Sequence, residues 1–277
     1  MNRQSAGNQI ELTYQLTGTI LETAKKLNLK YAQVRSYLTK HTNYVSKKKK
    51  PTMSQTYRKD YFEEINTPDK AYFLGFLKAD GYIDKNRNRV ALRLQEKDVE
   101  ILRKFCDVLQ LPQSRINKIK SKRDGQSDGV EIAITNEQFV APILDIKESS
   151  ILAKIPEEFS TDFIRGYFDG DGTIAYRNKQ KLYFSVAIVG SPNDDHMLQY
   201  ICKYIRGFTK IYTDKRSNLP YLKTDKKSVI ALFRDTIYKD CFIYLTRKKT
   251  KFDEFKLLFE TSTTTRETSL IEDEDIV

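Results

Sequence analysis

The chain has few of the side chains from which most protein metal and redox sites are built. Its 277 residues include only three cysteines and two histidines. Cys106, Cys202 and Cys241 lie far apart, fit neither a zinc motif nor a disulfide framework, and are interpreted as buried thiols. Because His41 and His196 are also isolated in the sequence, we expect no histidine-based metal site and no catalytic triad.

Long apolar runs are also missing. No stretch approaches the roughly 18 consecutive apolar residues that span a bilayer, and the N-terminal residues lack the apolar core of a signal peptide. We therefore expect no membrane partner and a cytoplasmic location. A bacterial or phage-encoded protein fits this expectation best, and an organellar one is the alternative.

Positive charge is in excess. The net charge is +11, and residues 1–60 hold 12 basic but only 3 acidic side chains. A basic arm favours a polyanionic partner, most simply nucleic acid, although a merely soluble, lysine-rich surface has the same composition. With 39% hydrophobic residues, 17 Tyr and 15 Phe, the chain is expected to fold into one or two domains with proper cores.

Residues 1–45 are predicted to form a small helical module. Apolar residues recur at helical spacing over 20–27, and a second helix is expected over 31–39 after a short turn. In a helix-turn-helix-like arrangement, the second helix would present Gln33 and Arg35 to a DNA groove. A plain helical hairpin is the alternative.

The remaining chain repeats one order of elements. Helix, hairpin, helix, hairpin and helix are predicted over 67–145 and again over 161–261, with an inter-half linker at 146–160. Two copies of one half-domain predict an α+β fold rather than a solenoid. A basic linker at 46–66, with four consecutive lysines, precedes them, and an acidic flexible tail at 262–277 follows.

Each predicted half-domain opens with a similar helix, "FLGFLKADG" at 73–81 and "IRGYFDGDG" at 164–172. In each helix two small residues lie four apart and therefore share one face. Glycine inside a helix costs about 1 kcal/mol relative to alanine, so the glycines indicate a compensating close contact between the two helices. The predicted interface residues are Gly75, Ala79, Gly166 and Gly170.

An aspartate closes each of these helices, against the negative end of the helix dipole. If the helices run parallel, Asp80 and Asp171 meet beside unpaired backbone carbonyls. Two carboxylates with carbonyl oxygens suit a hard divalent cation, above all Mg²⁺. One Asp-Gly pair alone would be a simple helix stop, but two copies at equal offsets favour the metal site.

These two stretches resemble the LAGLIDADG motif of homing endonucleases. Each matches the motif at four of nine positions, including the first glycine, the second aspartate and the final glycine. The resemblance covers about 67–260. It implies two pseudo-symmetric αββαββα half-domains that form a DNA-binding saddle, with the motif helices at their interface. Lys78 departs from the motif, where the second copy keeps Asp169, and could make the two half-sites unequal.

The resemblance also implies roles for single residues. Asp80 and Asp171 would hold Mg²⁺, for which Mn²⁺ could substitute, with the carbonyls of Ala79 and Gly170 as further candidate ligands. Glu96 or neighbouring Gln95 would position the attacking water. Lys147 and Lys248, which follow the two half-domains, could stabilise charge, although each could equally be an ordinary surface lysine.

Strand alternation predicts a polar sheet face that could bind base edges in a major groove. Val90, Leu92 and Leu94 would point inward, and their neighbours outward. A solvated sheet face would alternate in the same way. The candidate DNA-binding residues of the two half-domains are Arg87, Arg89, Arg93, Lys118, Lys120, Lys122, Arg177, Lys179, Lys181, Tyr183, Ser185, Lys210 and Tyr212.

The combined prediction is a monomeric, magnesium-dependent, site-specific endonuclease of double-stranded DNA, encoded within an intron or by a free-standing gene. It would hydrolyse one phosphodiester on each strand. Two alternatives on the same fold stay open. One is a maturase that binds intron RNA, and the other is a regulator that binds DNA without cutting it.

Overall fold

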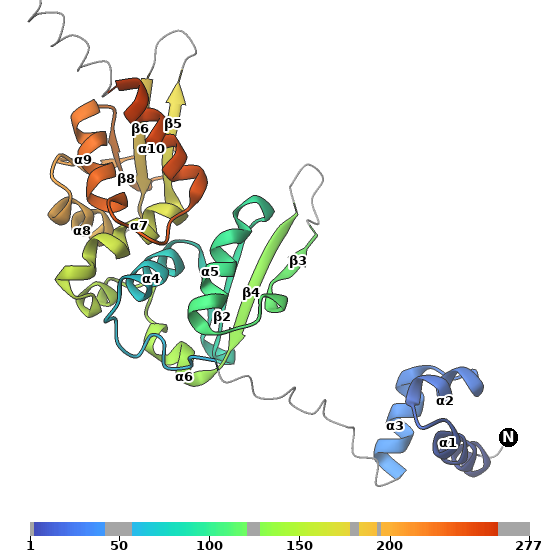
Figure 1. The fold of residues 1–277 in the computed structure, drawn as a ribbon. Helices are drawn as coiled ribbons and strands as arrows, with labels where there is room; N and C mark the ends of the chain where they lie inside the picture. The colour runs from blue at the N-terminus through green and yellow to red at the C-terminus, as the bar shows by residue number, and fades with distance from the viewer. Residues whose placement is uncertain (1–2, 42–56, 121–127, 178–182, 193–194, 260–277) are drawn as a thin grey trace, which may run out of the picture. The chain divides into compact units, whose positions relative to one another are not determined.

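A computed structural model of the chain describes residues 3–41, 57–120, 128–177, 183–192 and 195–259 (Figure 1). The chain divides into two compact units at Thr56 and Tyr57, and each unit has a hydrophobic core of its own. No helix in the described ranges is both long enough and apolar enough to cross a membrane.

The described part of the N-terminal unit, residues 3–41, contains three helices, not the predicted two. They are α1 (Arg3–Thr17), α2 (Ile20–Lys26) and α3 (Tyr31–His41). The turn between α2 and α3 places Asn28 at a φ of 51°. Helix α1 was not predicted because its apolar residues do not share one face: Ile10 packs into the core, whereas Leu12 and Leu16 are exposed.

The C-terminal unit consists of two half-domains with the same order of elements. The first contains α4 (Pro68–Asp80), β1 (Gly81–Asp84), β2 (Arg89–Gln95), α5 (Val99–Leu109), β3 (Asn117–Ile119), β4 (Gly129–Thr135) and α6 (Glu137–Val140). The second contains α7 (Ser160–Asp171), β5 (Gly172–Arg177), β6 (Tyr183–Val189), α8 (His196–Tyr204), β7 (Tyr212–Thr213), β8 (Pro220–Thr224) and α9 (Lys227–Tyr238), followed by α10 (Thr246–Phe259).

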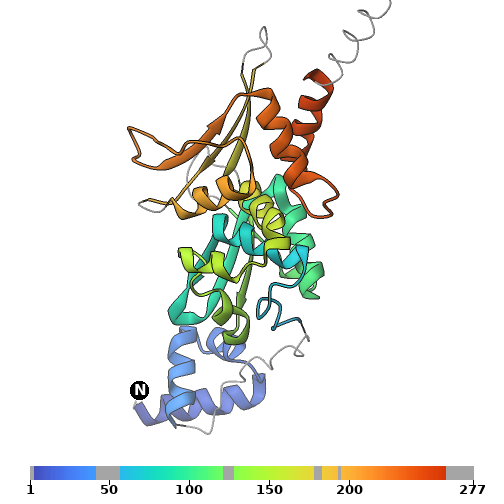
Figure 2. The same cartoon turned by 90° about the vertical axis from the view of Figure 1, so that its left-hand side faces the viewer.

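Each half-domain forms one antiparallel four-stranded sheet. The strand orders, β1-β2-β4-β3 and β5-β6-β8-β7, are equivalent. Helices α5 and α6 pack on the first sheet, and α8, α9 and α10 on the second (Figures 1 and 2). This architecture confirms the predicted fold class of two αββαββα halves.

Strand alternation decides which side chains enter the core. Val90, Leu92 and Leu94 of β2 are buried against the helices, as predicted. Phe184 and Val186 of β6 are buried in the same way. The other face of each sheet is therefore the one available to a partner.

The residues directly before α4 differ from the sequence-based expectation. Tyr61, Phe62 and Ile65 fall within the predicted linker 46–66, yet all three are buried in the core of the C-terminal unit. The Tyr61 hydroxyl also donates a hydrogen bond of 2.6 Å to Asp69 in the first turn of α4. The aromatic residues of this stretch thus outweigh its charges, and the compact unit begins at Tyr57.

The cysteines are less uniformly buried than expected. Cys106 lies inside the core, but Cys202 and Cys241 are only partly covered. All three are free thiols. Burial raises the pKa of the Cys106 thiol to about 11, so at neutral pH this side chain stays protonated and behaves as a small apolar group.

Candidate active site

Helices α4 and α7 pack against each other in parallel at the junction of the half-domains (Figure 2). A Cβ atom added to Gly75 would lie 2.0 Å from the carbonyl oxygen of Phe163, and one added to Gly166 would lie 1.9 Å from that of Tyr72. No larger residue fits at either position without moving a backbone. Glycine is needed here for close approach rather than for backbone freedom.

The same packing brings the C-terminal ends of the two helices together. A Cβ atom added to Gly170 would lie 2.4 Å from the Cβ of Ala79 and 3.4 Å from Oδ2 of Asp80. Asp80 and Asp171 end their helices, and each is followed at once by the first strand of its sheet. Two carboxylates therefore lie close together, on the exposed surface of the unit.

A lysine accompanies each of these helix ends. Lys147 Nζ donates hydrogen bonds to the carbonyl oxygens of Lys78 (2.5 Å) and Ala79 (2.9 Å), with a longer one to that of Leu77. These carbonyls belong to the last turn of α4, where helices leave carbonyl oxygens without backbone donors, although the Leu77 carbonyl also accepts from the N–H of Gly81. The ammonium group thus caps the helix and also opposes the negative end of its dipole.

Lys248 caps α7 in the equivalent way. Its Nζ donates to the carbonyl oxygens of Phe168 (2.5 Å), Asp169 (2.8 Å) and Gly170 (3.4 Å). The sequence placed both lysines after their half-domains and suggested a role in stabilising charge. The capping contacts depend on tertiary structure, because about 70 to 80 residues separate each lysine from its helix.

The electrostatics of the site follow from this crowding. Burial and the neighbouring Asp171 carboxylate raise the pKa of Asp80, and burial raises the pKa of Asp171. The ammonium groups of Lys147 and Lys248 oppose both shifts. Burial also lowers the pKa of Lys147, and it lowers that of Lys248 to about 8. The pKa of each carboxyl is therefore raised overall, despite the two nearby ammonium groups.

The predicted water-positioning residues, Gln95 and Glu96, lie at the C-terminal end of β2. Gln95 ends β2 and is exposed, and Glu96 accepts a hydrogen bond of 2.6 Å from Lys118. Within the described ranges, no hydrogen bond or ion pair joins Gln95 or Glu96 to Asp80. Likewise, no group of three or more His, Cys, Asp or Glu side chains in those ranges could hold a metal ion.

The outer face of the first sheet carries several of the predicted basic residues. Arg93 is exposed there, and Arg89 donates to Glu131 over 3.0 Å on the same face. Arg87 is exposed in the turn between β1 and β2, 3.6 Å from Asp84. Lys120 is exposed just beyond β3.

Strand register corrects one of these assignments. Lys118 pairs with Val130, and Val130 belongs to the buried face of the sheet. Since paired residues in an antiparallel ladder point to the same side, Lys118 leaves the sheet on its helix side, where it meets Glu96. On β3 the outward position belongs to Asn117, which pairs with the outward-facing Glu131.

The outer face of the second sheet is aromatic. The rings of Tyr212 and Tyr221 stack with centroids 5.6 Å apart, and Lys210 Nζ lies 5.2 Å from the centroid of Tyr212. The Tyr183 hydroxyl donates to Asp225. Ser185 was predicted to contact DNA, but only 4% of its surface is exposed.

Alternation would have revealed further outward residues. Tyr82 follows the first motif directly, pairs with Ala91 on the outer face and is 59% exposed. Thr173 is its counterpart in the second half. Lys223 is exposed on β8, beside Tyr221. Four predicted DNA contacts are not described at the level of their side chains: Lys122, Lys179, Lys181 and Arg177.

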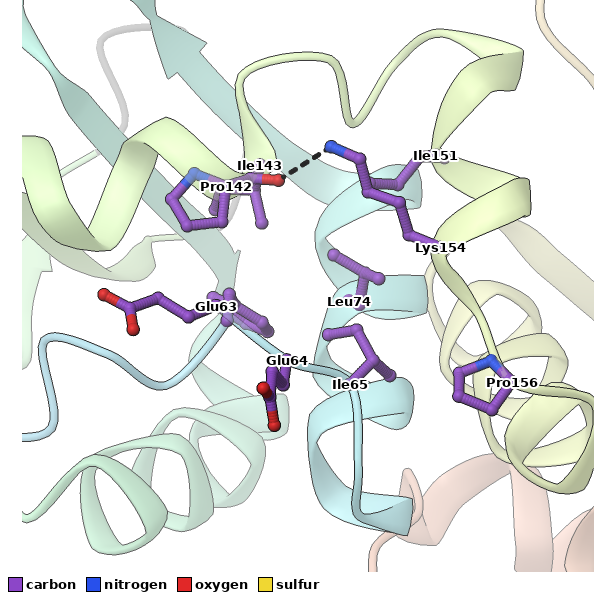
Figure 3. Close-up of a pocket in the computed structure, with 10 residues that line it drawn as sticks. Glu63, Glu64, Ile65, Leu74, Pro142, Ile143, Ile151, Lys154 and Pro156 are labelled. Atoms are coloured by element: carbon purple, nitrogen blue, oxygen red, sulfur yellow. Dashed lines mark hydrogen bonds between the residues drawn. The ribbon is translucent and has the colours of Figure 1, made fainter.

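A cavity of about 400 Å³ lies on the first half-domain, away from the aspartate pair (Figure 3). Leu74, Ile143 and Ile151 form an apolar wall, and Lys154 reaches across to the carbonyl oxygen of Pro142 (Figure 3). Neither Asp80 nor Asp171 lines it. The candidate site is therefore an open surface rather than a small-molecule pocket.

Comparison with known protein families gives one match. Residues 67–145 match the family model of the LAGLIDADG-like domain. The chain carries a LAGLIDADG-like domain. The matched range contains the first of the two motifs, at 73–81, and confirms the resemblance there. No curated protein matches the chain.

The LAGLIDADG fold extends over both halves. The I-LtrWI LAGLIDADG homing endonuclease bound to target DNA is 12% identical, with a TM-score of 0.51 over 74% of this chain and 92% of that one. The meganuclease I-SmaMI bound to an uncleavable DNA is 13% identical, with a TM-score of 0.50 over 74% and 94% of the two chains. At such low identity these similarities concern the fold.

Proposed function

We propose that the chain is a site-specific endonuclease of double-stranded DNA. The observation that carries this proposal is the meeting of Asp80 and Asp171 at the C-terminal ends of two parallel, closely packed helices. A strand of a separate sheet begins directly after each aspartate. This arrangement matches a substrate with two similar strands, in which one bond on each strand must be cut.

The donor set fits a divalent cation, and Mg²⁺ in particular, with Mn²⁺ as a substitute. Asp80 and Asp171 offer only oxygen ligands, and the carbonyls of Ala79 and Gly170 are close by. Mg²⁺ takes one or two carboxylates and completes its shell with water and substrate phosphate. Since burial raises the pKa of both aspartates, a cation would compensate two charges that the protein leaves crowded. When bound, it would polarise the phosphate and activate water.

The side chains of the protein would orient the cleavage centre, hold the helix ends and position water. Asp80 and Asp171 would orient the cleavage centre relative to the sheets. Lys147 and Lys248 would hold the helix ends in place and put positive charge beside the phosphate. Gln95 and Glu96 are retained as candidates for positioning water, because a side chain at a strand end can reorient when substrate binds.

Duplex DNA is the substrate because the surfaces beside the aspartates suit a long polyanion. The net charge is +11, and the outer sheet faces present Arg93, Lys223 and the Tyr212–Tyr221 stack. Arginine and tyrosine can contact base edges and phosphates. The DNA-bound structures of I-LtrWI and I-SmaMI support this choice. Since one chain supplies both aspartates, a monomer suffices.

The N-terminal module would add contacts to the same duplex. Gln33 and Arg35 are exposed on α3, as a recognition helix requires. Removal of residues 1–56 is expected to weaken DNA binding and reduce its salt dependence, while the aspartate pair stays intact.

Cleavage of a selected duplex tests the proposal. A target would be selected from randomised duplexes with Mg²⁺ present. Asp80→Asn and Asp171→Asn should each lower the cleavage rate by about 10²–10³-fold, without lowering the thermal unfolding temperature. Asp107→Asn is the control, because Asp107 is an exposed aspartate on α5.

Three outcomes would contradict the proposal. Wild-type cleavage by Asp80→Asn protein would show that the metal site lies elsewhere. Tight duplex binding without cleavage in Mg²⁺ or Mn²⁺ would indicate a non-cutting regulator. Preferential binding of structured intron RNA over duplex DNA would indicate a maturase.

A further inference from the structure

Lys78 and Asp169 occupy the same position of the two motifs but carry opposite charges. Each stands two residues before a motif aspartate. Both are buried, with 6% and 1% of their surfaces exposed. A buried charge requires hydrogen-bonding partners, so the contacts of the two side chains show what each one does.

Lys78 forms hydrogen bonds with the segment that carries Lys147. Its Nζ donates to the carbonyl oxygens of Ile146 (3.2 Å) and Glu148 (3.0 Å), the residues on either side of Lys147. In return, Lys147 Nζ donates to the carbonyl oxygen of Lys78. Lys78 therefore holds the backbone on both sides of Lys147, and Lys147 holds the backbone of Lys78.

Asp169 holds the segment that carries Lys248. Its Oδ2 accepts from the backbone N–H of Leu245 (2.8 Å), and its Oδ1 accepts from the hydroxyl of Tyr238 (2.5 Å). The carbonyl oxygen of Leu245 then accepts from the N–H of Lys248 as α10 begins. Lys248 Nζ donates back to the carbonyl oxygen of Asp169. In both halves the motif side chain hydrogen-bonds to the segment that carries the capping lysine. Lys78 donates these hydrogen bonds, whereas Asp169 accepts them.

The two charges differ because the two segments offer different backbone groups. Beside Lys147 the chain presents carbonyl oxygens, which need a donor. Ahead of Lys248 it presents an N–H group and a hydroxyl, which need an acceptor. Tyr72 adds a second hydroxyl to Asp169 at 2.8 Å, whereas the counterpart of Tyr72 in α7 is Phe163, which has no hydroxyl to offer Lys78.

We propose that Lys78 and Asp169 are positioning residues, one in each half, that fix the backbone carrying the capping lysines Lys147 and Lys248. Both side chains are buried, so each would act through the lysine that it positions. The catalytic consequence rests on the proposed nuclease function: loss of Lys78 impairs one half-site, and loss of Asp169 impairs the other. The positioning itself does not depend on that function.

Amide hydrogen exchange tests the positioning without any cleavage. Lys78→Met should raise exchange over residues 145–150 by about tenfold or more, because two charge-assisted hydrogen bonds are lost. Lys78→Arg should restore much of the protection. Lys70→Met is the matched control: Lys70 is also buried on α4 and donates to the Glu64 carbonyl and the Asn66 side chain, so exchange should rise only near 64–66.

Strand-specific nicking tests the catalytic consequence. On a supercoiled plasmid with the selected target, Lys78→Met should accumulate nicked circles cut on the same strand as those made by Lys147→Met. Asp169→Asn should accumulate nicked circles that are cut on the other strand, which is the strand that Lys248→Met also cuts. Tyr238→Phe provides a milder variant of the second half should Asp169→Asn fail to fold.

The outcomes separate the two hypotheses. Unchanged exchange over 145–150 in Lys78→Met would overturn the positioning. Two results for Lys78→Met would overturn the link between Lys78 and one half-site. One is equal slowing of cleavage on both strands, and the other is nicking of the strand that Lys248→Met cuts. A wild-type protein that cuts no DNA would refute the nuclease proposal, and the exchange result would then decide the positioning by itself.

Discussion

The two half-domains share one backbone plan and differ in how their capping lysines are enclosed. Lys248 is 2% exposed, and its neighbour Arg247 bonds to Asp98 of the other half over 2.9 Å. Lys147 is exposed, and its neighbour Glu148 pairs with Lys85 of its own half over 3.5 Å. A duplicated backbone thus creates two unequal electrostatic sites, because the side chains around each cap differ.

The sheets differ in the same sense. The first offers arginine and glutamine on its outer face, and the second offers stacked tyrosines with nearby lysines. Arginine reads guanine edges, whereas tyrosine and lysine give stacking and phosphate contacts with less base preference. We therefore expect a target whose two halves are unequal in sequence.

The largest change in stability is expected at the interface of α4 and α7, where the two halves are most alike. Gly75→Ala and Gly166→Ala should each lower the free energy of unfolding by about 3 kcal/mol or more, since the new methyl group would meet a backbone carbonyl. Urea denaturation measures both values. A loss at only one position would show that the helix interface is not symmetric.

Gly170→Ala provides a rescue control for these two variants. Its methyl group would meet the Cβ of Ala79 at 2.4 Å, a side-chain atom that can be removed. The double variant Ala79→Gly/Gly170→Ala should recover most of the stability that Gly170→Ala loses. Failure to recover would contradict direct contact between these positions.

The capping lysines should differ in their contribution to stability. Lys248→Met leaves buried carbonyl oxygens without their donor and should cost about 2 kcal/mol, whereas water can replace Lys147, so Lys147→Met should cost about 1 kcal/mol or less. Thermal and urea unfolding of both variants measure this difference. Equal costs would mean that the burial of Lys248 is unimportant.

The two sheets should respond differently to substitution. Arg93→Ala is expected to cost about 1–3 kcal/mol of discrimination at one base pair of the target. Lys223→Ala should instead weaken binding to all sequences and reduce the salt slope by about 1. Binding to a library of single-substitution targets at several salt concentrations distinguishes these effects. If both variants changed sequence preference and salt dependence in the same way, the proposed difference between the two sheets would be wrong.

A further effect concerns pH. Burial lowers the pKa of Lys248 to about 8 in the folded protein, against an ordinary value of 10.5. Between these values the unfolded chain binds the proton more strongly, so the contribution of Lys248 to the free energy of unfolding rises with pH. Urea unfolding from about pH 7 to 10.5 should show wild type gaining stability relative to Lys248→Met. A constant difference would contradict a lowered pKa.

Most of the fold could be predicted because its signals are local. Motif helices, hairpins and the buried faces of β2 and β6 follow from apolar periodicity and turn residues. Helix α1 was missed, since Leu12 and Leu16 face outward and obscure its periodicity. Residues 57–66 were also missed, since their charges suggested a linker while their aromatic side chains enter the core.

The site was predicted in part. The repeated offsets of glycine and aspartate indicated that Asp80 and Asp171 would meet. Strand register was harder to predict: a shift of one residue reverses the face, and Lys118 leaves the sheet on the helix side. Alternation within one strand does not reveal the burial of Ser185.

The sequence alone determined the duplication, the two helices with small faces and the acid at each end, because these depend on spacing along one chain. Tertiary structure alone decided how the capping lysines are held. Lys78 and Asp169 lie 68 and 76 residues from the backbone groups they bind, and charge does not specify a partner at that distance. Only the folded chain shows that a cation and an anion at equivalent positions hold equivalent segments, since one segment presents carbonyl oxygens and the other presents donors.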